Sequence, residues 1–233
     1  MDNNLLLIRK FITTRDKYSE DMDFSLLQPN KEFMLEDYFT PIINEFAALG
    51  REVVINKKEK KNQSNIESEF LKDDTAIYNL QFRTERSVKI KIELDINPPL
   101  GFSTESKLLI LPYSFMTRCY TMPSLYAGKM HALLYRKWNK RVKGRDWYDF
   151  EWYIKNNIGL DFSHFCERTR QFESQNIEQM SHESFKNQLK EKIVNTNMDM
   201  VKADVKPFLK DPEQLNIWST DYFLQLVDMI IFN

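Results

Sequence analysis

Two aspartates that lie two residues apart are the side chains of this chain best placed to do chemistry. They fall within Tyr18–Leu26, where Asp21, Asp23 and Ser25 alternate with apolar residues. Such alternation predicts a β-strand whose polar side chains share one face, with the two carboxylates roughly 7 Å apart at about 3.3 Å of rise per residue. Like charges at this separation repel each other, so the pair indicates a cation between them. A solvated strand end is the alternative interpretation.

A second acidic strand is predicted from Val88 to Asn97, with Glu93 and Asp95 on its polar face. If the two strands are neighbours, three or four carboxylates converge on one face of a sheet. Mg²⁺ typically binds one or two protein carboxylates and completes its octahedron with water and substrate phosphates. Two such ions about 3.5–4 Å apart can clamp the attacking and leaving oxygens of a displacement at phosphorus. The alternative is the exposed face of an amphipathic edge strand, on which Lys89 and Lys91 pair with the acids.

Other kinds of chemistry find less support in the sequence. None of the three histidines belongs to a motif with a partnered serine or cysteine, and the two cysteines have no metal-ligand spacing. The five glycines are too dispersed for a dinucleotide fingerprint or a Walker-type phosphate loop. The residues therefore favour phosphoryl or nucleotidyl transfer over hydrolysis by a histidine mechanism.

Composition sets the general class of protein. The 233 residues carry a formal net charge of −1, so the chain is not basic overall. The N-terminal residues lack the basic region and long apolar core of a signal peptide, and no apolar run is long enough to span a bilayer. We expect a soluble, cytoplasmic protein with no membrane partner.

Hydrophobic periodicity predicts an α+β fold. Residues 1–118 are expected to form a mixed β-sheet with flanking helices, and residues 119–233 a helical bundle that carries Lys129 and Asp146. A glycine, Gly50, is expected to stop the first long helix, and Ser219 or Thr220 to cap the last one. Strands are expected at 18–26, 52–55, 76–83, 88–97 and 108–111, and helices at 5–14, 32–49, 123–136, 146–155, 162–172, 185–193 and 222–232.

Four motifs in this order resemble the AbiEii/AbiGii nucleotidyltransferase toxin family. The resemblance spans roughly residues 5–155, and the motifs are YSEDMDF at 18–24, KIELDI at 91–96, AGKMHALLYR at 127–136 and KGRDWYD at 143–149. The family resembles polymerase-beta-type nucleotidyltransferases in fold. Its members are typically toxins of bacterial toxin–antitoxin or phage-defence pairs.

The resemblance implies roles for individual residues. Asp21 and Asp23 would hold Mg²⁺ or Mn²⁺, with Asp95 or Glu93 as the further acidic group, and Lys129 would contact nucleotide phosphate. The implied site residues are Asp21, Asp23 and Asp95 for the metal; Asp95, Glu93 and Asp146 for catalysis, with Arg145 and Asp149 orienting Asp146; and Lys129, Ser19 and Arg145 for the nucleotide.

The implied reaction transfers a nucleoside monophosphate from an NTP to an acceptor hydroxyl, with tRNA as one candidate acceptor and a cognate antitoxin as a partner. The alternatives are a non-catalytic module of the same fold that binds a nucleotide or a protein, and a metal-dependent nuclease. One departure concerns the glycine pair that precedes the first helix in the family. Met1–Asn4 occupy its place without a glycine, so either the sequence begins late relative to the family or this copy is catalytically weakened. We expect the late start, because Leu5 onward resembles the interior of that helix.

Structural interpretations of the later motifs remain open. Lys129 also suits the rim of a helix, and Asp146 is favoured near a helix N-terminus by the helix dipole alone. The basic segment from Lys137 to Arg145 suits either a solvated loop or a cradle for tRNA or another polyanion.

Overall fold

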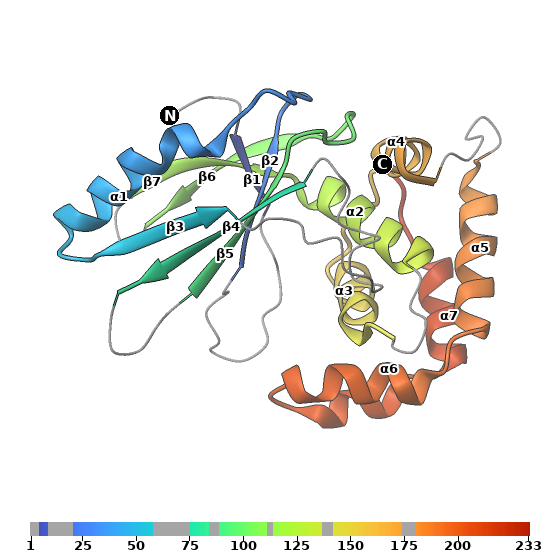
Figure 1. Cartoon of the computed structure of the whole chain (residues 1–233). Helices are drawn as coiled ribbons and strands as arrows, with labels where there is room; N and C mark the ends of the chain where they lie inside the picture. Colours follow the sequence, from blue (N-terminus) through green and yellow to red (C-terminus); the bar gives the residue numbers. More distant parts are fainter. Residues whose placement is uncertain are drawn as a thin grey trace. The chain divides into compact units, whose positions relative to one another are not determined.

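The chain forms two units, each with its own set of secondary-structure elements, in the computed structural model (Figure 1). The structure describes residues 5–8, 21–57, 75–83, 89–110, 114–136, 142–173 and 180–233. Unit 1 takes in the described residues within 1–10, 18–98 and 105–119, and unit 2 those within 99–104 and 120–233. Strands dominate unit 1 and helices dominate unit 2, which confirms the predicted α+β class.

A mixed β-sheet is the framework of unit 1. The described residues give it seven strands in the order β3-β4-β5-β2-β1-β7-β6. β2 is antiparallel to β1 and parallel to β5, while β4 is antiparallel to both β5 and β3. The strands are β1 (Leu5–Ile8), β2 (Asp21–Leu26), β3 (Val53–Lys57), β4 (Thr75–Phe82), β5 (Lys89–Asp95), β6 (Thr104–Leu109) and β7 (Phe115–Tyr120).

One face of this sheet is apolar and packs against the helix α1 (Phe39–Ala48), which the short 3₁₀ helix η1 (Leu35–Tyr38) precedes (Figure 1). The Phe39 ring meets the edge of the Tyr78 ring at 5.5 Å between centroids. Gly50 follows α1 with a φ of 68°, the left-handed conformation that suits a helix stop, as predicted. The core of unit 1 comprises Leu26, Leu35, Val53, Ile55, Tyr78, Leu80, Ile92 and Leu94.

One prediction about the sheet is wrong. Leu5–Ile8 form strand β1 rather than the helix predicted for residues 5–14, of which the rest lies outside the described residues. A short apolar run is compatible with either structure, and pairing with β2 supplies the hydrogen-bond partners of a strand. The alternative interpretation of 88–97 as an edge strand is excluded, because β4 and β2 flank β5. β7, which shows little alternation, was not predicted.

Unit 2 consists mainly of helices, most of them close to the predicted ranges. No described helix combines the length and the apolar character that crossing a membrane requires. The cap of α7 is Ser219, whose hydroxyl accepts a hydrogen bond from the Tyr222 amide at 3.1 Å. The helices are α2 (Met122–Tyr135), α3 (Gly144–Lys155), α4 (Phe162–Glu173), α5 (His182–Val194), α6 (Met198–Val205) and α7 (Thr220–Asp228), with 3₁₀ helices η4 (Lys206–Phe208) and η5 (Pro212–Ile217).

The last helix ends at Asp228, four residues before the predicted end at Phe232. The chain beyond it pairs with Leu160 instead. The Leu160 amide donates to the Ile231 carbonyl at 2.8 Å, and the Asn233 amide donates to the Leu160 carbonyl at 2.9 Å. These bonds satisfy backbone groups that another helical turn would otherwise satisfy.

A hydrogen-bond network joins the start of α2 to the start of α4 within unit 2. The buried Ser124 hydroxyl accepts from the Ser103 amide at 2.9 Å and donates to the Asp161 carboxylate at 2.8 Å. His164, which is also buried, lies 2.9 Å from the Leu100 carbonyl through Nδ1. Burial and the nearby Arg168 guanidinium lower the pKa of His164 to about 4, so the neutral ring donates this bond at pH 7.

We predict that His164 makes unit 2 sensitive to acid. Its folded-state pKa lies below the ordinary value of 6.5, so the unfolded chain binds more protons as pH falls from 6.5 towards 4. The free energy of unfolding should fall by about 2–3 kcal/mol across that window. His164→Asn keeps a donor for the Leu100 carbonyl, and urea titrations at pH 7 and pH 4.5 should show a smaller loss for this variant. Equal losses for both proteins would contradict the assignment.

Candidate functional site

The two predicted acidic segments lie on neighbouring strands. In the parallel pairing of β2 and β5, Asp23 is opposite Glu93 and Ser25 is opposite Asp95. Paired residues of adjacent strands lie about 4.8 Å apart and point to the same side of the sheet. Phe24, Ile92 and Leu94, which alternate with the acids, face the α1 side. The acids therefore share the opposite face of the sheet, which we call the acidic face.

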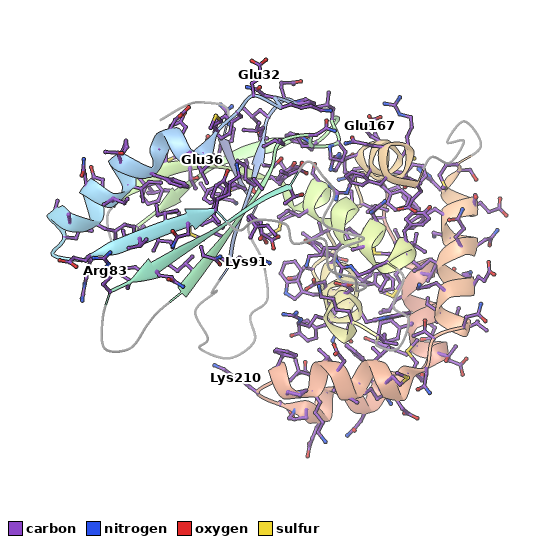
Figure 2. The ribbon with its side chains drawn as sticks, viewed as in Figure 1. Glu32, Glu36, Arg83, Lys91, Glu167 and Lys210 are labelled. Atoms are coloured by element: carbon purple, nitrogen blue, oxygen red, sulfur yellow. The ribbon has the colours of Figure 1, made fainter. Side chains whose placement is uncertain are left out.

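Both acids of β5, Glu93 and Asp95, have partners within the chain. The Glu93 carboxylate forms an ion pair with the Lys91 ammonium, two residues earlier on the same strand, and Figure 2 labels Lys91. The Asp95 Oδ1 atom accepts a hydrogen bond from the Asn97 amide at 3.0 Å. This bond fixes the Asp95 carboxylate where the strand ends and the chain turns towards the prolines at 98 and 99.

The donor set of the acidic face suits a hard divalent cation. Carboxylate oxygens are the protein ligands that Mg²⁺ prefers, and water or substrate phosphates fill its remaining positions. Among the described side chains, no three His, Cys, Asp or Glu residues are close enough to form a metal-binding group. The Asp21 side chain lies outside the described residues, although its backbone is part of β2. We therefore expect a metal here to bind Asp23 with Asp21 or Asp95, with water or substrate oxygens at its remaining positions.

The sites predicted on α2 and α3 form two ion pairs that join these helices. Lys129 Nζ lies 2.5 Å from Asp149 Oδ2, and Arg136 Nη1 lies 2.8 Å from Asp146 Oδ2. Both carboxylates are nearly inaccessible, with 4% and 6% of the side chains exposed, while 28% of Lys129 is exposed. Burial raises the pKa of Asp149, and the Lys129 ammonium acts in the opposite direction. The structural interpretation of Lys129 as a rim residue is thus incomplete, because it also neutralises a buried acid.

Positive charge accumulates where α3 begins. Burial, together with the guanidinium groups of Arg136 and Arg145, lowers the pKa of Lys143 to about 8, although Asp146 raises it. The Arg145 guanidinium also lies over the Phe208 ring, 4.9 Å from its centroid. An anion near Lys143 would offset this crowding of like charges.

Gly144 is a positioning residue that the sequence reasoning missed. A Cβ atom at this position would lie 2.3 Å from the Val201 carbonyl oxygen and 3.0 Å from the Val205 amide nitrogen. The Gly144 amide also donates to the Asp204 carboxylate at 2.9 Å. The absence of a side chain thus lets α6 pack directly on the first turn of α3. The glycine beside the predicted helix start is the signal, but its partner lies 57 or more residues away in the sequence.

The predicted site residues divide between the two units. Unit 1 brings Asp23, Glu93 and Asp95 together on the acidic face. Unit 2 gathers Lys129, Arg145 and Asp146 where α2 and α3 meet. Ser19 and residues 137–141 of the basic segment lie outside the described residues. The chemical roles of all these residues stay predictions.

We predict that Gly144→Ala destabilises the protein by about 2–3 kcal/mol, because the added methyl group must displace backbone atoms of α6. Gly128→Ala is the matched control within a helix. Its Cβ would meet nothing closer than 3.7 Å, so we expect no loss, or a gain of about 0.5–1 kcal/mol from the better helix former. Chemical denaturation measures both. Similar behaviour of the two variants would show that α6 does not pack as described.

The buried ion pairs generate a further prediction. Asp149→Asn should lower the free energy of unfolding by about 2–3 kcal/mol, less than for a fully buried pair because solvent reaches Lys129. The control is Asp228→Asn, which removes an exposed partner of Lys190 and should leave stability unchanged. Denaturant midpoints compare the two variants. A loss for Asp228→Asn as large as that for Asp149→Asn would argue against a structural role for the α2–α3 pairs.

Comparisons with known proteins agree with this architecture. No curated protein matches the sequence. The structure of JHP933 from Helicobacter pylori superposes with a TM-score of 0.51 at 16% identity, covering 98% of this chain and 84% of that one, which shows a shared fold. The nucleotidyltransferase toxin MenT4 from Mycobacterium tuberculosis has a TM-score of 0.40 at 13% identity, covering 98% of this chain and 75% of that one. The sequence model of the nucleotidyl transferase AbiEii toxins of type IV toxin–antitoxin systems matches residues 6–226, and the chain therefore belongs to that family.

Proposed function

We propose that this toxin-family protein transfers a nucleoside monophosphate from an NTP to an acceptor hydroxyl in a reaction that depends on a divalent metal. Family membership supports a nucleotidyltransferase with an NTP substrate and an antitoxin partner. The observation that carries the proposal is the register of β2 and β5, which sets Asp23 opposite Glu93 and places Asp95 two residues further along β5, opposite Ser25.

In this proposal, the acidic face holds the metal and prepares the acceptor. Asp21 and Asp23 bind Mg²⁺ or Mn²⁺ together with Asp95. A bound divalent ion supplies positive charge to the reacting oxygens and orients them for in-line displacement. Asp95, held by the Asn97 amide, takes the proton of the acceptor hydroxyl as its oxygen bonds to the α-phosphorus. The bond from that phosphorus to the pyrophosphate breaks at the same time, and pyrophosphate leaves with the electron pair.

The cations at α2 and α3 are proposed to bind phosphate. Lys129 and Arg145 supply positive charge for the nucleotide, and the crowding around Lys143 favours an anion there. Asp146 and Asp149 act as positioning residues in this account, because each is buried in an ion pair, Asp149 with Lys129 of α2 and Asp146 with Arg136, the residue that follows α2. Asp146 would have to break its ion pair with Arg136 before it could contact substrate.

The acceptor and the setting follow from the same proposal. An RNA, with tRNA as the first candidate, offers a terminal hydroxyl and a phosphate backbone suited to the basic residues near the start of α3. NTP, Mg²⁺ and RNA occur together in the cytoplasm, where we propose that the protein acts, opposed by its antitoxin, in phage defence.

A second candidate function is a nucleotide-binding module without turnover. The pairing of Glu93 with Lys91 and of Asp146 with Arg136 favours it, because two predicted catalytic acids are engaged. Calorimetry with NTP and Mg²⁺, run beside an assay for released pyrophosphate, separates the two functions. Binding without pyrophosphate release would support the module.

The direct test of the proposed reaction is the variant Asp23→Asn. With labelled NTPs, Mg²⁺ and total RNA, the native protein should incorporate label, and this variant should fall to background because its amide is a poor metal ligand. Asp37→Asn changes an exposed aspartate of η1 and should incorporate label normally. Normal incorporation by Asp23→Asn would refute the metal assignment.

A further inference from the structure

Lys91 is a cation built into the acidic face. In the β2–β5 register it lies opposite Asp21, and in the β4–β5 register it lies opposite Asn79. Lys91 and Glu93 alternate with Ile92, which is buried in the core, so both point to the acidic face. Their ion pair leaves 36% of the Lys91 side chain and 26% of the Glu93 side chain exposed.

The ion pair between Lys91 and Glu93 disfavours metal binding at Glu93. A divalent cation that approaches Glu93 meets the Lys91 ammonium and must displace it before it can bind the carboxylate. Asp95 lies two residues further from Lys91 along the strand than Glu93 does, and the Asn97 amide orients it. Both carboxylates have the right chemistry for Mg²⁺, and the Lys91 ammonium opposes its binding at Glu93.

We propose that Lys91 is a positioning residue that holds Glu93 out of metal coordination and so directs the divalent cation to Asp23 and Asp95. The proposal rests on the proposed function and deepens it, because it gives a reason why Asp95 rather than Glu93 is the third metal ligand. Lys91 also limits the affinity of the acidic face for the metal. Like charges about 7 Å apart, the spacing of i and i+2 residues on a strand, weaken binding of a divalent ion about five- to tenfold in a water-like dielectric.

Binding of Mn²⁺ to the full-length protein without nucleotide tests this proposal, with free Mn²⁺ measured by electron paramagnetic resonance. Lys91→Met should tighten binding about five- to tenfold, because the ammonium no longer opposes the metal and Glu93 becomes available. The double variant Lys91→Met/Glu93→Gln removes the ion pair without changing the net charge. Its dissociation constant should stay within about threefold of the native value. Asp95→Asn should weaken binding at least about tenfold, because it loses a ligand.

A matched control lies on β6, where Lys107 and Glu105 form an ion pair at 3.0 Å with the same spacing of two residues and similar exposure, 38% and 35%. Lys107→Met removes the same charge from another strand and should leave the Mn²⁺ dissociation constant unchanged. Thermal unfolding of each variant without metal confirms that it is folded, so that a change in affinity is read from a native protein.

Three other results would contradict the proposed role of Lys91 or the metal site itself. Unchanged affinity in Lys91→Met, or a shift no larger than that of Lys107→Met, overturns the role of Lys91. A loss of tenfold or more in the double variant shows that Glu93 is a ligand in the native protein and also overturns it. Native protein that binds no Mn²⁺ at all refutes the metal site of the proposed function itself, and the role of Lys91 falls with it.

Discussion

The parallel register of β2 and β5 is the constraint on which the rest of the proposed site depends. A slip of one residue would turn the acids of a strand towards the α1 side and its core residues away from it. Burial of Leu26 and Leu94 against the helix side therefore fixes the side on which Asp23 and Glu93 emerge. The apolar core thus holds like charges together that would separate if they were on mobile loops, and a cation or the Lys91 ammonium offsets their repulsion.

In unit 2, charged residues form buried ion pairs. Its acids on α3 are buried and paired with cations of α2, and stacking of the Tyr126 and Tyr153 rings at 4.4 Å adds apolar contact between the same helices. Buried pairs of this kind contribute little net stability, but removal of one partner is costly. They therefore favour one arrangement of α2 and α3 over others, which keeps Lys129 in a defined place beside its carboxylate.

Much of this architecture could be predicted because the regular burial of one face of a strand or helix produces a periodic pattern of apolar residues in the sequence. Strict alternation located β5, and helical spacing located most helices of unit 2. The pattern is ambiguous for Leu5–Ile8, because four apolar residues suit a helix or a strand. Pairing with β2 determines that they form a strand. Contacts between segments that are distant in the sequence could not be predicted either. Asp149 pairs with Lys129 on another helix, and Gly144 meets a helix far along the chain.

The central claim is that carboxylates of two strands share one divalent cation. Anomalous diffraction from crystals grown with Mn²⁺ and a non-hydrolysable NTP analogue tests this claim most directly. The account predicts a manganese peak bound by carboxylate oxygens of both Asp23 and Asp95 at about 2.1 Å, a typical distance for a small hard cation. A peak bound by Asp146 or Asp149, or one that contacts neither β2 nor β5, would contradict it.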